Sequence, residues 1–80
     1  MEKLSDRIQI IIDTMMERVS SMEESAQNCV EYTDLISKFF EMVNTVRRME
    51  LQNSADSPFF LHVEKIVCVA ELELKRNKDA

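Results

Sequence analysis

The chain has 80 residues, of which 45% are apolar and 31% charged, and its formal net charge is −5. This balance is typical of a folded globular or coiled-coil protein, because disordered segments are poor in apolar residues. The acidic charge disfavours binding to a phosphate backbone, which normally requires a basic surface. We expect one helical domain over residues 1–80, whose core alone supplies only about 3–5 kcal/mol of stability. Support from a second copy or another protein would fit that size.

Glycine is absent from the chain, and Pro58 is the single proline. These two residue types normally mark turns, strand ends and phosphate-binding loops. Their scarcity therefore predicts an all-α fold, either a small helical bundle or a helical hairpin. We expect helix to exceed about 65% of the chain, against roughly a third in an average globular protein.

The first half of the chain carries a long apolar heptad pattern. Alternate steps of four and three from Leu4 to Glu50 meet polar residues only at Arg18, Ser25 and Glu50. An uninterrupted helix would show such a pattern. The stretch 20–28 is nevertheless polar, so a break within 20–33 is the competing interpretation.

Candidate signals for that break are a capping box, a turn residue and a second helix start. Ser21 and Glu24 have the spacing of a capping box, and Thr33 followed by Asp34 offers a later start. Asn28 is the residue here that best tolerates a left-handed turn. The pattern leaves open whether these residues interrupt the helix.

Two architectures follow. In the first, helices near 3–26, 31–52 and 58–76 form an up-down-up bundle. In the second, one helix over 3–51 pairs with a return helix and dimerises, because its N-terminal half would expose an apolar stripe. The predicted partner-binding residues are those of this stripe: Ile8, Ile11, Ile12, Met15, Val19 and Met22.

The last helix has the clearest start signal. Ser57 can accept a hydrogen bond from a free amide of the first turn, and Pro58 suits the first helical position. We expect apolar residues of this helix to meet the preceding one across a hairpin closed at 52–57. The expected contact residues are Phe39, Val43, Phe60, Val63 and Val67. A strand over 66–74 is the alternative, disfavoured because the chain has no second strand to pair with it.

No cluster of residues has the pattern of a catalytic, metal or cofactor-binding site, so we expect no enzyme and no cofactor. His62 is the sole histidine, and it lies beside the apolar stripe of the last helix. Cys29 and Cys68 are interpreted as small buried apolar residues, about 18 Å apart along the hairpin and too distant for a disulfide. Glu23 and Glu24 diverge by about 100° on a helix and do not converge on one ion.

The apolar run 10–12 is too short for a signal peptide or a membrane span and is flanked by Asp6 and Asp13. Two cysteines without an export signal are typical of a reducing compartment, so the expected location is cytoplasmic.

Five methionines besides Met1 suggest either an adaptable binding surface or filler in a bundle core. The favoured function is a protein–protein interaction module: a small acidic helical adaptor, assembly chaperone or inhibitor, acting as a homodimer or on another protein. The alternative is a dimeric regulator that contacts nucleic acid through basic helix ends at Arg47 and Arg48 and at Lys75 and Arg76.

Overall fold

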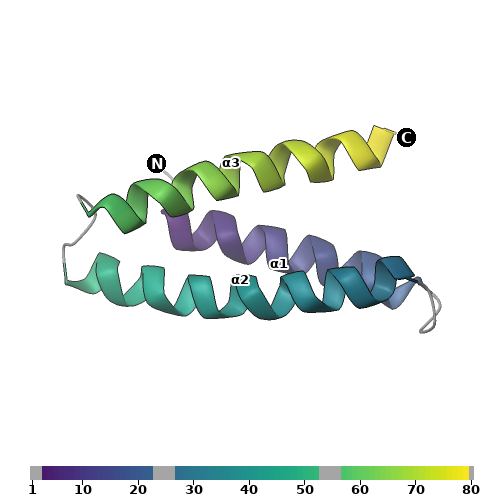
Figure 1. Ribbon diagram of the computed structural model, residues 1–80, viewed down its shortest axis with the longest axis horizontal. Coiled ribbons are helices and arrows are strands. Elements are labelled where there is room, and N and C mark those ends of the chain that lie inside the picture. The colour runs from purple at the N-terminus through teal and green to yellow at the C-terminus, as the bar shows by residue number, and fades with distance from the viewer. Residues whose placement is uncertain (1–2, 23–26, 53–56, 80) are drawn as a thin grey trace.

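A computed structural model of the protein describes residues 3–22, 27–52 and 57–79. Its three helices are α1 (Leu4–Ser20), α2 (Gln27–Leu51) and α3 (Pro58–Asp79), of 17, 25 and 22 residues. They run up, down and up in an elongated bundle of 41 × 23 × 18 Å, with α2 antiparallel to α1 (Figure 1). This confirms the all-α prediction and the three-helix architecture. The single helix over 3–51 is wrong, because α1 ends at Ser20 and packs beside α2.

Two serines mark the end of α1. The Ser20 hydroxyl donates to the Glu17 carbonyl at 2.6 Å, and the Ser21 hydroxyl to the Arg18 carbonyl at 2.9 Å. These carbonyls belong to the last turn, where acceptors lack helical amide partners, so local side-chain donors favour termination. The helix therefore ends six residues before the predicted 26. Glu24, the second half of the predicted capping box, lies outside the described residues.

The start of α2 also differs from the prediction, since the helix begins at Gln27 instead of 31. Asn28 and Thr33, expected to favour a turn or a helix start, both lie within it. The Thr33 hydroxyl donates to the Cys29 carbonyl one turn back, at 2.8 Å. A threonine inside a helix can form a hydrogen bond from its hydroxyl in this way. The preference of Thr33 for a helix N-cap therefore did not set the start of α2.

The predicted start of α3 is confirmed. Pro58 is its first residue, and the Ser57 hydroxyl accepts a hydrogen bond from the Phe60 amide at 3.2 Å. The alternative strand over 66–74 is wrong, because these residues all lie within α3. The free amides of the first turn are capped as the serine–proline pair indicates.

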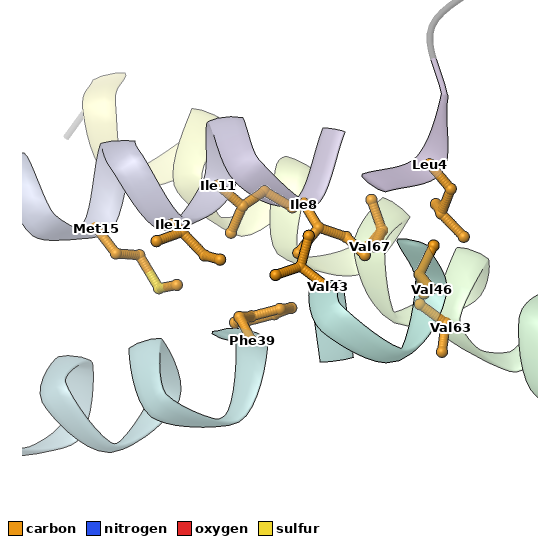
Figure 2. Packing of buried hydrophobic residues seen from close by; sticks show 10 residues of the cluster. All are labelled: Leu4, Ile8, Ile11, Ile12, Met15, Phe39, Val43, Val46, Val63 and Val67. Carbon is orange, nitrogen blue, oxygen red and sulfur yellow. The ribbon is translucent and has the colours of Figure 1, made fainter. Parts of the chain in front are cut away.

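The core is shared by all three helices, and α1 contributes half of its buried apolar side chains (Figure 2). The buried core residues are Leu4, Ile8, Ile11, Ile12, Met15, Phe39, Val43, Val46, Val63 and Val67. The predicted core residues Phe39, Val43, Val63 and Val67 are confirmed, whereas Phe60 is half-buried at its edge.

The packing of the helices differs from the expected hairpin of α2 and α3. Over the described residues α1 packs closely against both other helices, while the backbones of α2 and α3 hardly approach each other. The ribbon of α1 lies between α3 and α2 in Figure 1. The bundle is therefore centred on its shortest helix, and α2 and α3 are joined mainly through α1.

Candidate association surfaces

The predicted partner-binding stripe of α1 lies mostly inside the bundle. Ile8, Ile11, Ile12 and Met15 are 0–2% exposed, and Val19 and Met22 are half-buried. The expectation that this stripe is exposed is therefore corrected for the four buried residues, because α2 and α3 cover them. A role for the six residues in binding another chain stays a prediction that would require the bundle to open.

Two polar residues in the heptad pattern bind α1 to its neighbours. Glu50 of α2 accepts a 2.6 Å hydrogen bond from the hydroxyl of buried Ser5, and a weaker one from the Ser5 amide at 3.4 Å. The Glu50 carboxylate therefore accepts from a free amide in the first turn of α1. The N-cap residue of this helix, Lys3, makes no side-chain hydrogen bond of its own. Arg18 donates to the Leu74 carbonyl of α3 at 2.7 Å. The two polar residues that interrupt the heptad pattern, Arg18 and Glu50, thus hold α1 in place against α3 and α2.

A third contact joins the first turn of α1 to the second half of α3. The Arg7 guanidinium donates to both carboxylate oxygens of Glu71, at 2.6 and 3.1 Å, and lies 3.5 Å from the Cys68 sulfur. The hydrogen bonds to Glu71, followed by the one to Cys68, raise the pKa of Arg7 above its usual range. Arginine is charged at neutral pH in any case, so this arrangement orients α3 without creating a titrating group.

A groove opens between α2 and α3 at the end of the bundle where α3 finishes. Its volume is about 810 Å³. The lining side chains come from the end of α1, the first half of α2 and the second half of α3: Arg18, Ser21, Met22, Asn28, Glu31, Tyr32, Leu35, Ala70, Glu73 and Leu74. We call this the open-end groove. It lies where the backbones of α2 and α3 hardly approach each other.

The outer side of α3 carries a second apolar stripe. Leu61, Val69 and Leu72 are 55%, 59% and 62% exposed, and Cys68 is also exposed. At about 100° per residue these four positions share the side opposite the buried Val63 and Val67. We call them the outer stripe of α3. The signal in the sequence is that apolar residues occur all around this helix, whereas a helix with one buried face has a single stripe.

The remaining candidate residues do not converge on one site. Arg47 and Arg48 lie at the end of α2 and Lys75 and Arg76 near the end of α3, at opposite ends of the bundle (Figure 1). Arg47 also donates to the Gln9 side chain at 3.0 Å. One monomer therefore does not join the two basic pairs into a single patch.

The cysteines and the histidine also lie apart from any cluster. Both cysteines are free; Cys29 is half-buried, but Cys68 is exposed, so its predicted burial is wrong because it lies on the outer side of α3. His62 is exposed. Over residues 3–22, 27–52 and 57–79, no three His, Cys, Asp or Glu side chains gather as metal ligands would.

None of the described helices combines the length and the apolar character needed to cross a membrane. Comparison with protein-family models, with curated proteins and with solved structures found no match. Within the part of the chain that the structure describes, the open-end groove and the outer stripe of α3 are the two surfaces with the character of binding sites.

Proposed function

We propose that this protein is a protein-association module of the adaptor type, which forms a homodimer through the outer stripe of α3. The observation that carries the proposal is the exposure of Leu61, Val69 and Leu72 on the side opposite the core. Isolated exposed apolar residues are common, but a row along one helix face marks an association surface. Burying it would also add apolar area to a bundle of marginal size.

The arrangement of the stripe suits a second copy of the same chain. Leu61 and Leu72 lie at its two ends, with Lys65 and Cys68 between them. When two α3 helices cross antiparallel about a two-fold axis, Leu61 of each copy can face Leu72 of the other. Such an isologous contact is the commonest way to close a dimer. The stem of Lys65 can cover apolar surface while its ammonium group stays in water.

The experiment compares two glutamate variants by size-exclusion chromatography with light scattering at micromolar concentration. Leu72→Glu places a charge in the proposed interface, and Val30→Glu places the same charge at a 57% exposed residue of α2 outside it. We expect a dimer for the parent and for Val30→Glu, and a monomer with parent-like circular dichroism for Leu72→Glu. A monomeric parent, or a Leu72→Glu variant that stays dimeric, would contradict the proposal.

A further inference from the structure

We infer that the open-end groove binds a basic amphipathic helix of a partner protein. The groove is separate from the outer stripe of α3, so this inference goes beyond the proposed homodimer and does not depend on it. Its occupant is defined by the apolar floor of the groove, by the charge of its rims and by the spacing of residues along its walls.

The floor of the groove is apolar. Tyr32, Ala70 and Leu74 pack on the core and are half-buried, and Leu35 is more exposed. All four also line the groove. Side chains placed in this way are covered by the core on one side and available to a ligand on the other. An occupant must therefore bring apolar side chains of its own.

The rims of the groove are acidic. Glu31 of α2 and Glu73 of α3 are exposed on its two sides. The cation in the lining, Arg18, is already bonded to the Leu74 carbonyl. Glu73 pairs with Arg76 of its own helix at 3.3 Å, but both side chains are exposed, and such pairs contribute little. Lysine or arginine side chains of a partner would complement these carboxylates, whereas an acidic partner would be repelled.

The walls have the spacing that receives a helix. On α2 the lining residues are Asn28, Glu31, Tyr32 and Leu35, and on α3 they are Ala70, Glu73 and Leu74. Spacings of three, four and seven residues keep side chains on one side of a helix, so each wall presents a row of side chains to the groove. A partner helix fits between two such rows with apolar residues three or four apart. Met22, which also lines the groove, can adjust to the shape of the partner's side chains.

The test uses two synthetic helical peptides that have the same pattern of leucines and differ only in their polar residues, all lysine in one and all glutamate in the other. Binding is followed by amide chemical shifts of the labelled protein. We expect the leucine–lysine peptide to bind and to shift amides around Leu35 and Ala70, and the leucine–glutamate peptide not to bind.

Charge reversal tests the site itself. The double variant Glu31→Lys and Glu73→Lys should weaken binding of the lysine peptide by at least about tenfold and allow the glutamate peptide to bind. The matched control, Glu17→Lys with Glu41→Lys, makes the same change in net charge at exposed residues outside the groove and should keep the parent's preference. Leu35→Ser leaves every charge in place and should also weaken binding, which tests the apolar floor independently.

Three outcomes would overturn the inference. If the control variant weakens binding of the lysine peptide equally, the peptide is attracted to the overall negative charge of the protein and not to the groove. Chemical shifts centred on Leu61 and Leu72 would place the peptide on the outer stripe instead. Equal binding of both peptides to the parent would remove the role of the rims. Because the homodimer is tested by Leu72→Glu, failure here leaves that proposal standing, and the reverse also holds.

Discussion

Helices α1 and α3 both carry apolar residues at helical spacing, yet those of α1 are buried in the bundle and many of those of α3 are exposed. The stripe of α1 is covered by α2 on one side and α3 on the other, so Ile8 and Ile12 have no exposed surface. The backbone of α3 approaches α1 more closely than it approaches α2, and the outer side of α3 stays exposed at Leu61 and Leu72. The comparison shows that position in the bundle, more than apolar content, decides which stripe is available to a partner.

Polar contacts also distinguish α1, which is bonded to both other helices, from the outer side of α3. Helix α1 is joined to α2 by Ser5 and to α3 by Arg7 and Arg18. These contacts fix the helix at its first turn and at its end. Disturbing α1 should therefore affect the whole fold, and disturbing the outer side of α3 should affect association alone.

The largest expected effect is that of charge in the stripe of α1. Replacing Ile11 and Met15 with glutamate should unfold the protein, because both sites are buried and unpaired buried charges are costly. Circular dichroism should show loss of the cooperative thermal transition. The same pair of changes at Leu61 and Leu72 should leave the transition in place. A double variant of α1 that melts like the parent would show that α1 is not the centre of the core.

Truncation gives a graded version of the same comparison. Ile12→Ala removes buried methyl groups and should lower the free energy of unfolding by about 2–5 kcal/mol. Leu72→Ala, at a site that is exposed in the monomer, should change the value by less than about 0.5 kcal/mol when the protein is dilute enough to be monomeric. Urea unfolding of the two variants beside the parent measures both values. Equal losses would mean that the outer stripe is already buried, as in a dimer stable under the conditions used.

The contact between Ser5 and Glu50 should have a smaller effect. Ser5 is 4% exposed, and Glu50→Ala would leave its hydroxyl without the observed acceptor. We expect Glu50→Ala to lower the free energy of unfolding by about 1–3 kcal/mol. A double-mutant cycle with Ser5→Ala should give a favourable coupling energy, and Ser37→Ala, at an exposed residue of α2, provides the control. Additive single effects would show that the hydrogen bond does not stabilise the fold.

The smallest effect is expected for the pair of Arg7 and Glu71. Arg7→Lys loses the two-pronged geometry and should cost about 1 kcal/mol or less, because both side chains are partly exposed. The folded-state pKa of Arg7 is raised, so its stabilising charge is complete at any pH below the ordinary arginine value. The cost should therefore be the same in neutral and mildly alkaline buffer. Arg76→Lys, in an exposed pair, should show no measurable loss.

The sequence by itself determined the all-helical class, the start of α3 and four residues of the core, Phe39, Val43, Val63 and Val67. Lack of glycine predicted an all-helical chain, the serine and proline at 57 and 58 predicted the start of α3, and heptad spacing identified Ile8, Ile11 and Met15 as one apolar stripe. These features depend on interactions within one or two helical turns, which a short stretch of sequence specifies.

Only the tertiary structure decided which apolar stripe is inside and what the polar interruptions do. Glu50 reaches Ser5 across 45 positions of sequence, and Arg18 reaches Leu74 across 56. The open-end groove likewise combines residues from all three helices. Local periodicity shows that a face is apolar, but what covers that face depends on contacts between distant segments, which form only when the bundle assembles.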